Sequence, residues 1–164
     1  RKLTVAKESF RIPLKQENVD FIKNAMIGVT KEGTSARSFI NAPYVSGGKT
    51  GTAQAASMSK SVKYDASKIN ERLRDHSLYI AFAPADKPKI ALAIIVENAG
   101  FGAAQAAPIA RRVFDYWLLG TYPSLEDIEA AQKGQAVTPI GVKRRKEDIQ
   151  LTPSEGVVGV MGNR

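Results

Sequence analysis

Residues 44–54 contain the side chains of this chain that are best suited to binding an anion. Lys49 supplies a positive charge and Thr50 a hydroxyl, with glycines on both sides of the pair. Glycine inside a strand often marks the close approach of a ligand or another backbone. Because successive side chains of a strand alternate between its faces, Thr50 and Thr52 would project from the same face. The pattern predicts a strand edge that offers backbone donors, an ammonium group and two hydroxyls to an anionic ligand.

The tripeptide Lys49-Thr50-Gly51 admits three interpretations. It matches the end of the nucleotide phosphate loop Gly-x4-Gly-Lys-Ser/Thr, but the first glycine is replaced by Pro43, and Gly51 is a poor start for the helix that must follow. It also matches the Lys-Thr-Gly element of active-site serine penicillin-binding proteins and β-lactamases. The third interpretation is a glycine-rich strand without a functional role. The surrounding sequence has to decide between them.

The composition is that of one globular domain with a basic surface. The chain has 164 residues, 43% of them hydrophobic and 24% charged. Its net charge of +8 is compatible with an acidic polymer, a membrane surface or nucleic acid as a neighbour. The basic residues are scattered except at 143–146, and aromatic residues are not interleaved with them, so we expect a solvated surface and no nucleic-acid partner. With no cysteine and only His76, we expect no metal site and no cofactor.

Hydrophobic periodicity predicts helices packed on an antiparallel sheet. Three segments are expected as strands: residues 44–54, 76–84 and 89–97. A short turn joins the last two, which indicates an antiparallel hairpin. Two segments with helical spacing flank the strands, and their apolar stripes are expected to face the core: Val19, Ile22, Met26 and Val29 in the first, and Ala106, Ile109, Ala110, Val113 and Trp117 in the second. This order is typical of an α+β fold.

The composition changes after Gly120. Residues 121–164 contain three prolines and five glycines, and they show no sustained hydrophobic period. We therefore expect the packed unit to span residues 1–120 and residues 121–164 to form a flexible C-terminal extension.

Several features together resemble the C-terminal part of the transpeptidase domain of class B penicillin-binding proteins. They are Lys49-Thr50-Gly51-Thr52-Ala53-Gln54, the strand ending in Phe82-Ala83-Pro84, the strand ending in Glu97-Asn98, the closing helix, and Gly33-Thr34-Ser35-Ala36 after the first helix. The run Glu71-Arg72-Leu73-Arg74-Asp75-His76 further resembles the penicillin-binding protein 2 branch, the elongation-specific D,D-transpeptidases. The resemblance covers about residues 16–120. It implies a penicillin-binding protein/β-lactamase-like fold.

Two motifs of that family are missing from this chain. The nucleophile of the family lies in Ser-x-x-Lys at a helix start well before Lys-Thr-Gly, and a Ser-x-Asn element lies between them. Ser46…Lys49 and Ser57…Lys60 spell the first pattern, but one overlaps the motif strand and the other follows it, and no Ser-x-Asn occurs. The chain also begins with Arg1 instead of Met. We therefore expect residues 1–120 to be incomplete, the nucleophile and a membrane anchor to lie on an N-terminal remainder of the same protein, and the isolated chain to be inactive.

The resemblance implies a role for each residue of the motif strand. A serine of the remainder would attack the D-Ala-D-Ala carbonyl of a peptidoglycan stem peptide and form an acyl-enzyme. An amine of a second peptidoglycan strand would then resolve the acyl-enzyme. Lys49, Thr50 and Gly51 would belong to the catalytic site, and the backbone N–H of Thr52 to the oxyanion hole. Thr50, Thr52 and Gln54 would bind the substrate.

The resemblance also implies partners and a location. Stem peptides and β-lactam antibiotics would bind at the motif strand. A membrane glycan polymerase and cell-shape scaffold proteins would be partners during cell-wall elongation, at the periplasmic face of the bacterial inner membrane. Two alternatives stay open: a β-lactamase-like serine hydrolase, and a non-catalytic interaction module of the same fold.

Overall fold

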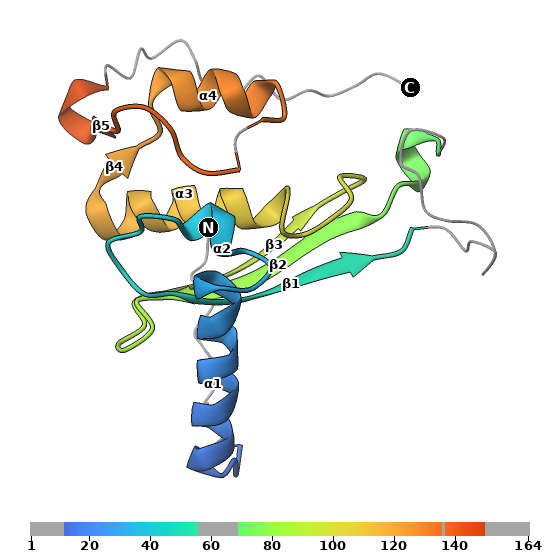
Figure 1. The fold of residues 1–164 in the computed structure, drawn as a ribbon, viewed down its shortest axis with the longest axis vertical. Coiled ribbons are helices and arrows are strands. Elements are labelled where there is room, and N and C mark those ends of the chain that lie inside the picture. The colour runs from blue at the N-terminus through green and yellow to red at the C-terminus, as the bar shows by residue number, and fades with distance from the viewer. Residues whose placement is uncertain (1–11, 56–68, 136, 150–164) are drawn as a thin grey trace, which may run out of the picture.

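The computed structural model describes residues 12–55, 69–135 and 137–149, and it shows helices packed on a three-stranded antiparallel sheet (Figure 1). The elements are α1 (Gln16–Lys31), α2 (Ala36–Phe39), β1 (Gly47–Ala53), η2 (Glu71–Leu73), β2 (His76–Ala83), β3 (Ile90–Val96), α3 (Ala106–Leu119), β4 (Thr121–Tyr122), α4 (Leu125–Gln132), β5 (Arg144–Arg145) and η3 (Lys146–Asp148). The sheet order is β1-β2-β3. The α+β prediction is confirmed, as is the antiparallel hairpin of the second and third strands.

The core lies between the sheet and helix α3. Strand β2 is central, and its register runs from Gly47↔Phe82 to Ala53↔His76 on one side. Its buried residues alternate along the strand as one face of a pleat requires. They meet small side chains of α3 and two phenylalanines, and the cluster comprises Phe39, Tyr79, Ala81, Ala83, Ala106, Ala107, Ala110 and Phe114.

Helix α3 packs on the sheet through its alanines and Phe114. Ala106, Ala110 and Phe114 are fully buried. The prediction that Ile109, Val113 and Trp117 share this buried face is wrong, because they are 43%, 38% and 62% exposed. Helical spacing alone places all of these residues in one wide apolar stripe. Only the part of the stripe that carries the alanines packs closely on the sheet.

Helix α1 projects from the sheet and is packed only near its C-terminal end (Figure 1). Thr30 is its buried residue, and the Thr30 hydroxyl donates to the Ser46 carbonyl oxygen at 2.6 Å. Phe21 and Ile22 are 73% and 57% exposed. The helix is therefore present as predicted, but Ile22 does not face a core formed by the described residues.

After Gly120 the described residues continue to 149, apart from residue 136, and they form regular elements. Strands β4 and β5 pair with Thr121 opposite Arg145, and helix α4 lies above α3 (Figure 1). Residues 150–164 lie outside the described part. The segment is attached by polar contacts, which leave no hydrophobic period in the sequence.

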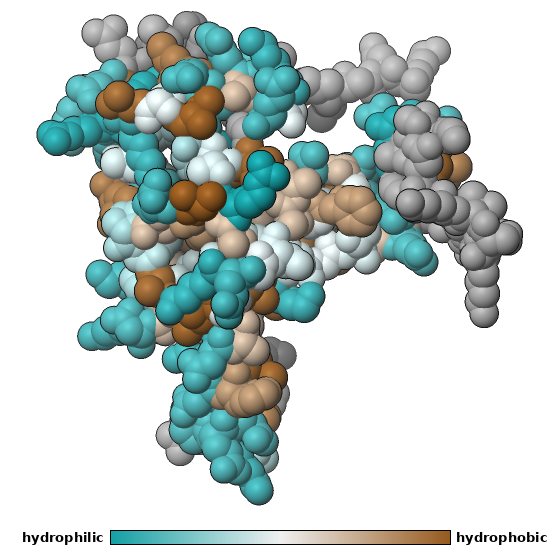
Figure 2. All heavy atoms as spheres, viewed as in Figure 1, coloured by the Kyte–Doolittle hydropathy of each residue, from teal (hydrophilic) through white to brown (hydrophobic). Residues whose placement is uncertain are grey.

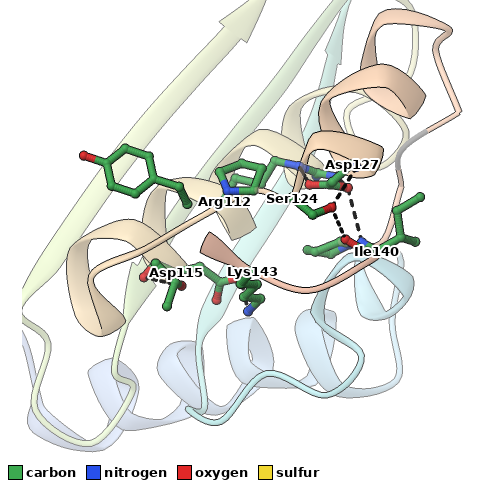
Figure 3. Close-up of a pocket in the computed structure, with 10 residues that line it drawn as sticks. Arg112, Asp115, Ser124, Asp127, Ile140 and Lys143 are labelled. Atoms are coloured by element: carbon green, nitrogen blue, oxygen red, sulfur yellow. Dashed lines mark hydrogen bonds and ion pairs between the residues drawn. The ribbon is translucent and has the colours of Figure 1, made fainter. Parts of the chain in front are cut away.

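A buried carboxylate joins α4 to α3. The Asp127 side chain is fully buried and accepts from Arg112 Nε at 2.8 Å and Arg112 Nη2 at 2.6 Å (Figure 3). Ser124 Oγ accepts from the Asp127 backbone N–H at 2.9 Å and donates to the Ile140 carbonyl oxygen at 2.7 Å. Ser124 therefore caps the start of α4 and also fixes the returning chain.

A second buried carboxylate, Asp115, joins this segment to the region before β1. It accepts from Arg111 Nε at 3.0 Å, Lys143 Nζ at 2.7 Å and the Tyr44 hydroxyl at 2.8 Å. Burial, followed by the Asp115 charge, raises the pKa of Tyr44 far above its ordinary value. The phenol consequently keeps its proton and remains a donor.

Asp127→Asn is expected to lower the free energy of unfolding of the complete protein by about 3 kcal/mol, because it leaves the charge of Arg112 without its partner in a buried site. Glu129→Gln, an equivalent charge removal at an exposed position of α4, is expected to change it by less than about 0.5 kcal/mol. Denaturant unfolding followed by intrinsic fluorescence measures both. Equal effects of the two substitutions would contradict a buried carboxylate anchor.

Candidate active-site edge

Strand β1 has an open edge. Among the described residues it pairs with β2 alone, so its other edge is free of strand pairing. Lys49 is exposed, and its ammonium donates to the Thr50 carbonyl oxygen at 2.6 Å. Thr52 is exposed as well, while Thr50 is partly buried. The ammonium and both hydroxyls are therefore borne by a strand that a ligand can approach from the side.

The backbone N–H groups of Thr50 and Thr52 point to this open edge. A β-carbon built on Gly102 would contact the carbonyl oxygens of both Gly51 and Leu78, so these oxygens lie close together between the two strands. In an antiparallel ladder, residue pairs whose backbone N–H and C=O groups bond to each other alternate with pairs whose backbone groups point away from the partner strand. Gly51 and Leu78 form a pair of the first kind. The N–H groups of Thr50 and Thr52 therefore point away from β2.

Two of the three glycines of the motif strand make room for aromatic rings. A β-carbon at Gly47 would lie 2.5 Å from Cζ of Phe82, and one at Gly48 would overlap the Tyr79 hydroxyl. From the sequence alone, these glycines indicate the close approach of a ligand. At these two positions the structure gives a packing reason instead. At Gly51 the nearest atom to such a carbon is Leu78 Cβ at 3.2 Å, a tight but less severe contact.

The Tyr79 hydroxyl fixes the turn between α1 and α2. It lies 2.8 Å from Ser35 Oγ, and both residues are fully buried. Ser35 Oγ also donates to the Val29 carbonyl oxygen at 3.1 Å, so the single Ser35 proton is used there and Tyr79 is the donor to Ser35. Burial raises the pKa of Tyr79, so the phenol keeps its proton.

This turn brings Thr34 to the motif strand. Thr34 Oγ1 lies 3.1 Å from Thr50 Oγ1. The sequence offered Thr34 only as part of Gly33-Thr34-Ser35-Ala36, without a role for its hydroxyl. The structure therefore adds a hydroxyl beside the predicted site that spacing along β1 could not reveal.

The other predicted positions lie as follows. Gln54 is exposed just after the end of β1. Ser46 is 2% exposed and its carbonyl oxygen accepts from Thr30, so this serine is not available as a nucleophile. Residues 57–60, the other Ser-x-x-Lys match, lie outside the described residues. Nδ1 of His76 accepts from the Asn98 N–H at 2.9 Å and closes the end of the β2–β3 hairpin.

The fold agrees with the comparisons to known proteins. Residues 4–115 match the family of penicillin binding protein transpeptidase domains, and the chain belongs to this family. Two similar relatives are named Peptidoglycan D,D-transpeptidase MrdA. The one from Haemophilus influenzae is 43% identical over 94 residues, which are 57% of this chain and 14% of the relative. The one from Acinetobacter baumannii is 47% identical over 98 residues, 60% of this chain and 14% of the relative.

Solved structures of penicillin-binding protein 2 share the fold. The structure of Pseudomonas aeruginosa PBP2 in complex with WCK 5153 is 36% identical with a TM-score of 0.52, covering 64% of this chain and 20% of that one. PBP2 of Helicobacter pylori, solved in complex with MreC, matches with a TM-score of 0.54 and 24% identity over 70% of this chain and 20% of that one. The chain thus spans about one seventh of the length of the MrdA relatives.

Gly48→Ala is expected to lower the free energy of unfolding of the complete protein by about 1–3 kcal/mol, because the added methyl group overlaps the Tyr79 phenol. Gly28→Ala is the matched control. A β-carbon there would have only Glu32 Oε1 nearby, at 3.9 Å, in the body of α1. We expect the control to raise stability by up to about 1 kcal/mol. Denaturant unfolding distinguishes the two, and tolerance of Gly48→Ala would show that Tyr79 does not fill this space.

Proposed function

We propose that the complete protein is a serine D,D-transpeptidase of peptidoglycan and that this chain supplies one wall of its active site. The open edge of β1 carries the proposal, because Lys49, Thr50 and the backbone of Thr52 are accessible along it. Family membership and the MrdA relatives support it. The nucleophilic serine belongs to the N-terminal remainder of the protein.

In this proposal the edge binds the two negative charges of the reaction. The terminal carboxylate of the stem peptide lies beside the hydroxyls of Thr50 and Thr52, and the Lys49 ammonium stabilises it electrostatically. The Thr52 N–H points to the open edge and donates to the oxyanion that forms when the serine attacks the carbonyl. The substrate backbone lies along the edge as an added strand. A β-lactam offers a similar carboxylate and carbonyl, and it binds in the same way.

Exposed apolar surface supports a covering remainder. Ile80 and Ile95, on the sheet face opposite the α3 core, are 51% and 68% exposed. Phe21 on the projecting helix α1 is 73% exposed, and hydrophobic side chains are visible at the surface of this helix (Figure 2). Apolar side chains left exposed together often mark a contact surface. The N-terminal remainder, with the serine-bearing helix, covers this side.

The cellular setting follows from the same resemblance. We place the domain at the periplasmic face of the bacterial inner membrane, where it acts in cell-wall elongation with a membrane glycan polymerase and cell-shape scaffold proteins. None of the helices within the described residues is long and apolar enough to span a bilayer. In this proposal the anchor belongs to the remainder.

Lys49→Ala in the complete protein is expected to lower the rate of acylation by a fluorescent penicillin about 10²–10³-fold, since it removes a preorganised charge beside the developing negative charge. Lys87→Ala, an exposed lysine of the β2–β3 turn, is expected to leave the rate unchanged. Gel fluorescence after timed exposure measures both. Normal labelling of the Lys49 variant would remove this residue from the mechanism.

The isolated 164-residue chain is expected to take up no fluorescent penicillin covalently, because the nucleophile lies elsewhere in the proposed enzyme. Mass spectrometry after prolonged incubation detects a single acyl adduct. An adduct on any serine of this chain would show that the nucleophile is present here and would overturn the proposed division of the active site.

A further inference from the structure

We infer that Thr34 is a positioning residue that orients the Thr50 hydroxyl toward the substrate carboxylate, an inference that rests on the proposed function. The two hydroxyl oxygens lie 3.1 Å apart, within hydrogen-bonding distance. They belong to segments 16 residues apart in the sequence, the turn after α1 and strand β1.

Four contacts hold the turn in place. Gly33 packs so closely on α1 that a β-carbon there would lie 2.8 Å from Val29 Cα. The Ser35 N–H and hydroxyl both donate to the Val29 carbonyl oxygen, each at 3.1 Å. Ser35 Oγ also accepts from the buried Tyr79 phenol. The residues on either side of Thr34 are thus fixed, and Thr34 projects from a rigid support.

Tyr79 of β2 connects the turn that carries Thr34 to the part of the motif strand that carries Thr50. Tyr79 is the register partner of Thr50, and its hydroxyl bonds Ser35, the neighbour of Thr34. Near the start of β1, Thr30 holds the Ser46 carbonyl oxygen at 2.6 Å. The separation between Thr34 and Thr50 is therefore set by buried contacts, although the two threonine hydroxyls are themselves accessible to water.

When substrate is present, the available protons determine which threonine is the donor in the Thr34–Thr50 hydrogen bond. Each hydroxyl has one proton to donate and two lone pairs. A carboxylate only accepts, so Thr50 must turn its proton to the substrate. Its oxygen then accepts from Thr34. The Thr34 hydroxyl thereby stabilises the one orientation of Thr50 that binds the anion, and it reduces the conformational freedom lost on binding.

The test uses the complete protein and the second-order rate constant for acylation by a fluorescent penicillin. Thr34→Val keeps the shape and removes the hydroxyl, and we expect a loss of about threefold to tenfold, the range of a single neutral hydrogen bond. Thr34→Ser keeps the hydroxyl and is expected to stay within about twofold of the parent. In a Thr50→Val background, Thr34→Val is expected to add less than about a twofold loss, because its partner is already absent.

The remaining outcomes separate this inference from the proposed function. Equal losses from Thr34→Val in both backgrounds, or a failure of Thr34→Ser to restore the rate, would overturn the inference and indicate a structural role. An unchanged rate in Thr34→Val together with a large loss in Thr50→Val would also overturn it, while the proposed function stands. An unchanged rate in both Lys49→Ala and Thr50→Val would instead overturn the proposed function.

Discussion

The buried hydrogen bond between Tyr79 and Ser35 is the contact on which the geometry of the motif strand depends. The phenol reaches past β1 through the space that Gly48 leaves, and it holds the turn after α1. A buried hydroxyl without a partner costs about 1–3 kcal/mol, so the phenol and the turn are fixed together. The glycine before Lys49 is thus required by an interaction on the core side of the strand.

Two buried carboxylates hold the segment after Gly120 in place. Asp127 holds α4 against α3, and Asp115 connects Lys143, Arg111 and Tyr44. Buried ion pairs add little net stability, but the loss of one partner is costly, so they favour one arrangement over others. Through Tyr44, which precedes β1, this network fixes the start of the chain segment that leads into the candidate active-site edge.

The sequence predicted the strands and the α+β class because their apolar runs reflect burial in a core that this chain itself forms. The prediction was wrong for Ile22 and Trp117, whose apolar spacing indicates burial but does not show which surface covers them. The elements after Gly120 have no hydrophobic period in the sequence, for a different reason. Their anchors are Asp127, Ser124 and Lys143, and hydrophobic periodicity does not detect polar contacts.

The candidate site was predictable only as far as it lies on one strand. Lys49, Thr50 and Thr52 are neighbours in sequence, and the alternation of a strand relates them directly. Thr34 reaches Thr50 through a turn whose position depends on Gly33, Ser35 and a tyrosine from β2. No local pattern encodes such a contact, since it requires the packed sheet.

An open strand edge is both a binding surface and a hazard, because its free N–H groups can pair with any extended chain. Lys49 bears on both properties. Its exposed ammonium places a charge beside the edge, which disfavours pairing with a second copy of the same strand. An extended peptide that ends in a carboxylate experiences attraction from the same charge. In the proposed function, the residue that restricts non-specific pairing would therefore also attract the anionic ligand.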